Sequence, residues 1–129
     1  MNKIYLIKAE ESLQSANVLF KNKLYNDAVS RAYYTALQIT IVALNHYQCI
    51  DINNVREYSH KTIIRAFVKK LIHEKQIYSA EIKGYLQELL NNRITADYEP
   101  HITISPEKAK NCVEKAAYFY EIVRNSLQK

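Results

Sequence analysis

Apolar residues recur at intervals of three and four along most of this chain of 129 residues, a spacing that places them on one side of an α-helix. The stripe nearest the N-terminus is formed by Leu6, Ala9, Leu13, Ala16 and Phe20. The pattern predicts a first helix that ends at a turn over residues 21–23.

A second apolar pattern, over residues 25–47, is wider than the first. Its members extend around most of the predicted helix: Ala28, Val29, Ala32, Tyr33, Ala36, Leu37, Ile39, Val42 and Ala43. A helix that is apolar around most of its circumference is usually central. Residues 49–58, which contain several turn-forming Asn and Asp residues, predict a loop after this helix.

Three further helix starts are marked by serine residues, which are favoured at the N-cap. Ser59 precedes a third helix with an apolar face from Ile63 to Leu71. Ser79 precedes a fourth, which contains Gly84; close packing against a neighbour is the usual reason for a glycine inside a helix. Ser105, Pro106 and Glu107 combine an N-cap, a proline in the first turn and an acid, and they predict a fifth.

The fold class that follows is all-α, an antiparallel bundle of about five helices, with the second and fourth helices central. One glycine and two prolines argue against an all-β fold, which needs frequent turns. The last helix is expected to bury either Phe119 or Tyr120. We predict a single domain over residues 1–129, since no linker or repeat interrupts the pattern.

Composition adds little to the functional prediction. A net charge of +5 permits a nucleic-acid or acidic protein partner without requiring one. Cys49 and Cys112 lack metal-ligand spacing and are interpreted as reduced and buried. No metal or cofactor is predicted, because zinc motifs and a glycine-rich phosphate loop are both missing from the sequence. No apolar run reaches the length of a membrane span, so we expect a cytoplasmic protein without membrane contact.

A polar stripe interrupts the second helix, where Asp27, Arg31, Tyr34 and Gln38 follow one another by four, three and four residues. In one interpretation Arg31 pairs with Asp27 one turn away and faces water. In the other, Arg31 and Tyr34 lie in a cleft or a subunit interface.

A basic ridge is predicted on the third helix, where Lys61, Arg65, Lys69 and His73 recur every four residues. Lys61, Arg65 and Lys69 are candidate nucleic-acid contacts, although a solvated helix face gives the same pattern. His60 opens this helix, where the helix dipole is expected to lower its pKa.

Residues 92–101 hold the candidate catalytic side chains: Arg93, Asp97, Tyr98 and His101. Helical spacing places Asp97 one turn from Arg93, so the two residues could simply form an ion pair, with the Tyr98 ring buried and its hydroxyl bonded. His101 follows Pro100, which disfavours helix at the residue before it, so His101 is expected on a loop.

The order of three motifs resembles the small prokaryotic HEPN-domain proteins. These motifs are SRAYYTALQ at residues 30–38, SHK at 59–61 with AFVKKLI at 66–72, and NRITADY at 92–98. The resemblance covers nearly the whole chain. It implies a helical bundle that forms a homodimer, with the arginine motif lining a cleft between protomers.

The resemblance also implies an activity, because many relatives are metal-independent ribonucleases that act as toxins beside a minimal nucleotidyltransferase antitoxin. Their motif is an arginine, four to six residues, and a histidine. The histidine handles the proton while the arginine stabilises phosphate charge. In this chain Tyr98 stands where the shortest spacing would place the histidine, and His101 comes one residue beyond the longest.

Two functions are therefore carried forward. The first is a ribonuclease toxin that uses Arg93 with His101 or Tyr98. The second is a HEPN binding module without catalysis, which docks a nucleotidyltransferase or another partner and could hold a nucleotide or an RNA end.

Overall fold

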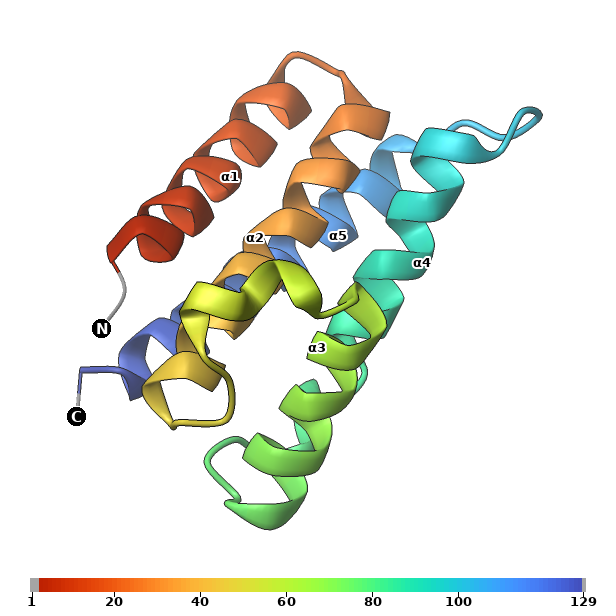
Figure 1. Ribbon diagram of the computed structural model, residues 1–129. Coiled ribbons are helices and arrows are strands. Elements are labelled where there is room, and N and C mark those ends of the chain that lie inside the picture. Colours follow the sequence, from red (N-terminus) through yellow and green to blue (C-terminus); the bar gives the residue numbers. More distant parts are fainter. Residues whose placement is uncertain (1–2, 129) are drawn as a thin grey trace.

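The computed structural model describes residues 3–128, and within that range the chain is helical with no strand (Figure 1). This confirms the all-α prediction. The α-helices are α1 Lys3–Lys21, α2 Tyr25–His46, α3 His60–Ala66, α4 Tyr85–Tyr98 and α5 Pro106–Ser126. The shorter elements are the 3₁₀ turns η1 Ile52–Glu57 and η3 Ala80–Ile82, and the π-helical segment η2 Phe67–Glu74, which continues α3 without a break.

Helix α2 is the centre of the bundle, as its apolar circumference predicted. It packs against α1, α4 and α5, and a continuous run from Ile39 to Leu44 is buried. Burying apolar side chains on several sides removes much more surface from water than a single stripe can, so α2 dominates the core.

The prediction that the fourth helix is also central is wrong. Only Leu86 and Leu89 are buried on α4, because polar residues occupy most of its remaining circumference. Helix α5 instead contributes a long buried face that ends in Phe119 and Val123, while Tyr120 is only half-buried. Helix α4 therefore covers one side of α2 and keeps a polar face outside.

The two cysteines are free thiols with different surroundings. Cys112 is buried on α5, and burial raises the pKa of its thiol to about 11. Cys49 is half-buried, so the prediction that both cysteines are buried holds for Cys112 alone.

The segment after α2 is more ordered than the loop predicted for residues 49–58. The Asp51 side chain accepts a hydrogen bond of 2.9 Å from the backbone N–H of Asn53 and starts the 3₁₀ turn η1. Val55 is buried beneath this turn. In Figure 1, η1 lies in front of α2 and therefore covers part of the central helix, while α3 continues beside it towards α4.

Serine caps begin the third and fifth helices as predicted. Ser59 accepts a hydrogen bond from the Thr62 N–H, and Ser105 accepts one from the Lys108 N–H, both at 3.1 Å. Ser79 caps only the short turn η3, and α4 begins later, at Tyr85.

Gly84 immediately precedes α4 and is not within it. Apart from the glycine and its neighbours along the chain, no heavy atom lies within 4 Å of the position that a Cβ would take there, and its φ is −93°. The placement of Gly84 inside the fourth helix is therefore wrong, and close packing does not explain this glycine.

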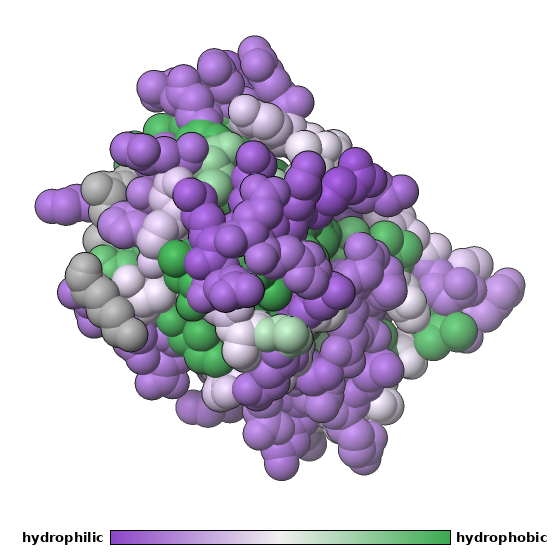
Figure 2. All heavy atoms as spheres, turned by 90° about the horizontal axis from the view of Figure 1, so that it is seen from below, coloured by the Kyte–Doolittle hydropathy of each residue, from purple (hydrophilic) through white to green (hydrophobic). Residues whose placement is uncertain are grey.

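Hydrophilic side chains cover most of the lower face of the molecule, and hydrophobic ones show between them as separate patches (Figure 2). None of the helices in the range 3–128 combines the length and apolar character that a membrane crossing requires.

Candidate functional site

The ring of Tyr34 on α2 is the meeting point of side chains from three helices. The guanidinium carbon of Arg31 lies 4.8 Å from the ring centroid, and that of Arg93, on α4, lies 5.4 Å from it. The imidazole of His60, at the start of α3, meets the same ring edge-on at 6.1 Å between centroids. We refer to Arg31, Tyr34, His60 and Arg93 as the Tyr34 cluster. The aromatic face partly compensates two guanidinium charges that would otherwise repel each other.

Arg93 is held in place from two sides. Its Nε lies 3.0 Å from Oδ2 of Asp97, and the other oxygen of Asp97 accepts a 2.6 Å hydrogen bond from the Ser30 hydroxyl on α2. The Nε–H bond of Arg93 does not point at Oδ2 of Asp97. The contact between these two atoms is therefore an ion pair and not a directed hydrogen bond. The Tyr98 ring lies 5.5 Å from the guanidinium carbon. The Arg93–Asp97 pair that the spacing predicted is thus present, and it is anchored to α2.

The two Nη groups of Arg93 have no hydrogen-bond acceptor among the described residues. The side chain is 18% exposed, so these donors are fixed in direction but remain accessible. A planar guanidinium fork suits two oxygens of a phosphate or a carboxylate. The arrangement can therefore bind an oxyanion without reorganising.

His60 is held by the hydroxyl of Tyr33, which lies 2.9 Å from its Nδ1. Tyr33 is fully buried, and burial raises the pKa of its hydroxyl, so Tyr33 stays protonated. Because this imidazole is the hydroxyl's one hydrogen-bond partner among residues 3–128, the hydroxyl donates to Nδ1. In the neutral ring the proton then sits on Nε2.

The pKa of His60 is lowered by burial and, to a smaller extent, by the charge of Arg93. The direction agrees with the expectation from the helix terminus, but these two causes come from tertiary packing. A neutral imidazole at pH 7 and a guanidinium that share the Tyr34 ring can together bind a phosphate and exchange a proton.

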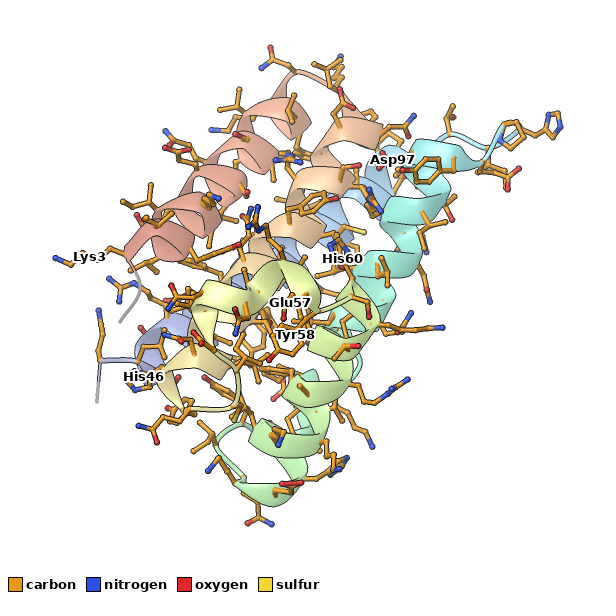
Figure 3. The ribbon with its side chains drawn as sticks, viewed as in Figure 1. Lys3, His46, Glu57, Tyr58, His60 and Asp97 are labelled. Atoms are coloured by element: carbon orange, nitrogen blue, oxygen red, sulfur yellow. The ribbon has the colours of Figure 1, made fainter. Side chains whose placement is uncertain are left out.

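The candidate catalytic residues divide into two groups. Arg93, Asp97 and Tyr98 lie together at the end of α4. Tyr98 is 68% exposed, however, so the buried ring expected for the ion-pair interpretation is wrong. His101 is exposed on the loop between α4 and α5, as Pro100 predicted, and no contact joins it to the Tyr34 cluster in the described part of the chain. Asp97 and His60 lie on different helices that both face α2 (Figure 3).

Tyr33, Ser30 and the closeness of His60 to Arg93 were not foreseen from the sequence. The available signal was the SHK motif, which places a histidine at a helix start. The structure decides against an ion pair between Arg31 and Asp27. The guanidinium of Arg31 stacks on Tyr34, and no ion pair with Asp27 is present among the described residues. Whether Arg31 and Tyr34 also form a subunit interface stays a prediction.

The basic ridge lines a shallow groove of about 330 Å³ between α4 and the continuous helix formed by α3 and η2. Lys61, Arg65, Lys69 and His73 are exposed on its walls, and Gln87 of α4 lies opposite. The segment that carries Lys69 and His73 is π-helical. A π-helix has a wider turn than an α-helix, so side chains four residues apart stay closer to one line.

Comparison with known proteins agrees with this architecture. Residues 3–126 match the HEPN domain family, and the chain belongs to that family. Two relatives come from Methanocaldococcus jannaschii. "Putative toxin MJ0142" is 30% identical over 112 residues, covering 87% of this chain and 71% of the relative, and "Putative toxin MJ0605" is 29% identical over 128 residues, covering 94% and 84%. A "UPF0332 protein" of Thermotoga maritima is 24% identical over 121 residues, covering 94% and 86%.

Proposed function

We propose that this HEPN-domain protein is the toxin of a toxin–antitoxin or defence system, and that it cleaves RNA as a metal-independent endoribonuclease. The names of its two archaeal relatives support the first part. The observation that carries the second part is the Tyr34 cluster, in which a fixed guanidinium and a neutral imidazole flank one aromatic ring. The proposed antitoxin is a minimal nucleotidyltransferase, as the family resemblance implies.

The reaction starts when an RNA phosphate binds the two Nη groups of Arg93. The neighbouring 2′-hydroxyl attacks phosphorus and its proton passes to a base. The 5′-oxygen of the next nucleotide leaves and takes a proton from the protonated base or from water. The products are a 2′,3′-cyclic phosphate and a 5′-hydroxyl. Arg93 stabilises the charge that grows on the phosphate oxygens, and preorganised donors of this kind make a large contribution to catalysis.

His60 is the base that the geometry favours. Its pKa is already lowered, so the ring is neutral and able to accept a proton at pH 7. When the imidazole proton sits on Nδ1 and is donated to Tyr33, Nε2 becomes the acceptor. That tautomer leaves the Tyr33 hydroxyl proton without its partner, at a cost of roughly 1–3 kcal/mol. His60 would thus supply in space the histidine that the Arg93 motif lacks in sequence, while His101 remains the competing candidate.

RNA substrates with a single deoxyribose test this function. An RNA that wild-type protein cleaves at one site should resist cleavage when the nucleotide 5′ to that site carries a 2′-deoxyribose, because the attacking hydroxyl is gone. The fragments of the unmodified RNA should carry cyclic phosphate ends by mass spectrometry. Cleavage of the deoxy substrate at the same rate would contradict the proposal.

The proposed route for RNA to the site includes the basic groove. Lys61, Arg65 and Lys69 are exposed along one line and can each neutralise a backbone phosphate. The cleft is proposed to be completed by a second protomer in a homodimer, as the family resemblance implies. The polar stripe on α2 is the reason for proposing Arg31 and Tyr34 at the interface.

The dimer has its own test. Light scattering at micromolar concentration should give twice the monomer mass of 15.1 kDa. Arg31→Glu should shift the protein towards the monomer, because it places a carboxylate where a cation packs on Tyr34. Lys110→Glu on the exposed face of α5 is the matched control and should leave the mass unchanged. A wild-type protein of 15.1 kDa would refute the dimer.

Two observations favour the alternative, a binding module without catalysis. The resting tautomer of His60 presents an N–H at Nε2, and a donor next to Arg93 binds a phosphate without removing a proton. The exposed apolar side chains Ile94, Tyr98 and Ile102 lie at the end of α4 and on the loop after it, where a partner protein could dock. RNA that binds without being cleaved would select this alternative.

A further inference from the structure

A pocket of about 370 Å³ adjoins the Tyr34 cluster and shares two of its walls, Tyr34 and His60. Its other walls come from α1, from the middle of α2, from the segment of η1 and Tyr58 that precedes α3, and from Ile63 of α3. Figure 3 shows Tyr58 in that segment and His60 at the start of α3. The volume lies within the range of small-molecule sites, roughly 300–1,000 Å³.

The pocket changes character from its floor to its rim. The floor is apolar and buried: Leu37, Ile41, Val55 and Ile63. The half-buried aromatic rings of Tyr34 and Tyr58 stand above it. At the rim are the exposed cations Lys8 and Arg56, and the ammonium of Lys8 lies 4.9 Å from the centroid of the Tyr5 ring. A ligand that fits must therefore be flat and weakly polar at one end and anionic at the other.

The Gln38 amide makes one side of the pocket rigid. In the orientation that satisfies both ends of the amide, its nitrogen donates to the carbonyls of Lys8 at 3.0 Å and Tyr34 at 3.1 Å and lies 2.7 Å from the Ser12 hydroxyl. These bonds tie α1 to α2 at the pocket wall. The pocket is consequently formed before any ligand arrives, which reduces the entropy lost on binding.

We propose that this pocket takes an unpaired nucleobase of RNA, next in the strand to the phosphate held by Arg93. This inference rests on the proposed function and adds to it a base-binding subsite. Aromatic walls over an apolar floor bind the faces of a base, and cations at the rim bind the following phosphate. A base inside a duplex is stacked and paired and cannot enter, whereas an unpaired base can turn outward.

Binding of nucleotides tests the pocket without any chemistry. The four nucleoside monophosphates and ribose 5-phosphate, which lacks a base, are titrated into wild-type protein by calorimetry. At least one nucleotide should bind about tenfold more tightly than ribose 5-phosphate, in the range that base stacking on an aromatic ring contributes. Equal affinity for the sugar phosphate and all four nucleotides would overturn the inference.

Two variants separate the base from the phosphate in this assay. Tyr58→Leu, which keeps apolar volume at a half-buried position, should remove the preference for the nucleotide and leave ribose 5-phosphate binding unchanged. Arg56→Glu, at an exposed position, should weaken both ligands. Lys110→Ala is the cationic control and should change neither. Unchanged nucleotide affinity in folded Tyr58→Leu and Arg56→Glu proteins would also overturn the inference.

Cleavage rates on single-stranded and duplex RNA distinguish a wrong assignment of the pocket from a wrong assignment of the ribonuclease activity. Wild-type protein should cleave a site in single-stranded RNA at least tenfold faster than the same site in a duplex, and Tyr58→Leu should lose that ratio. Equal rates on both substrates would reject the pocket and keep the ribonuclease. Nucleotide binding by a protein that cuts no RNA would reject the ribonuclease, and with it this assignment to the substrate strand.

Discussion

Arg93→Ala is expected to lower the rate of RNA cleavage by about 100- to 1,000-fold, the usual effect of removing a donor that stabilises charge in a transition state. The guanidinium is fixed by Asp97 and lies between the Tyr34 and Tyr98 rings, and its two Nη groups face no acceptor in the described residues. Single-turnover cleavage measures this loss, and growth arrest on expression of the chain should disappear with it.

The same variant should fold almost as well as wild type. Arg93 and Asp97 are an i,i+4 pair on one helix, with side chains 18% and 28% exposed. Pairs of this kind contribute about 0.3–0.5 kcal/mol, compared with roughly 3–5 kcal/mol for breaking a buried pair. The melting temperature should therefore fall by no more than a few degrees.

Asp97→Ala is the matched control for the pair. It removes the same ion pair but keeps the guanidinium, so its melting temperature should resemble that of Arg93→Ala while it retains more activity. If both variants melt far below wild type, the pair is structural. A folded and fully active Arg93→Ala protein would contradict the catalytic and the structural interpretations together.

His60→Gln is expected to reduce cleavage by about 100- to 10,000-fold, the range for loss of a general acid or base. Glutamine keeps a side chain that can hydrogen-bond with Tyr33 but has no group that titrates near neutral pH. His101→Ala is the comparison, because His101 is exposed on the loop after α4. A loss of about a hundredfold in His101→Ala with an active His60→Gln protein would instead assign the proton transfer to His101.

The pH profile gives this prediction a second readout. The folded pKa of His60 lies below the ordinary value of 6.5, so the base stays neutral and active at pH 7. Activity should fall only as the pH drops through that lowered pKa, and this acid limb should be missing from the residual activity of His60→Gln. Because the charge of Arg93 is one cause of the shift, Arg93→Gln should move the His60 titration upward in an NMR experiment.

The stability of the protein should also depend on the protonation of His60. The unfolded chain protonates His60 near pH 6.5, whereas the folded protein resists protonation until the pH is lower. The contribution of His60 to the free energy of unfolding is therefore fully present above about pH 6.5. It decreases as the pH falls from 6.5 through the lowered folded pKa, because the unfolded state then binds more protons than the folded state. The loss in melting temperature between pH 7.5 and 5.5 should be smaller in His60→Gln than in wild type.

The sequence by itself determined the class of fold and the position of most helices. Apolar spacing, serine caps and the Ser105–Pro106 start are local signals, and they act within one or two turns of the chain. The same kind of local spacing predicted the Arg93–Asp97 ion pair, since both residues lie on one helix. The extent of burial is not local, so α4 was wrongly placed at the centre and Tyr98 was wrongly expected to be buried in the ion-pair interpretation.

Only the tertiary structure decided which side chains meet around Tyr34. His60 and Arg93 are separated by the rest of α3, a π-helical segment, a 3₁₀ turn and the first part of α4, and no spacing rule relates them. Packing of α3 and α4 on α2 brings both to one ring, buries the Tyr33 hydroxyl against the imidazole, and lowers the pKa of His60. The chemistry of the site therefore depends on distances across the bundle, which the order of residues along the chain does not contain.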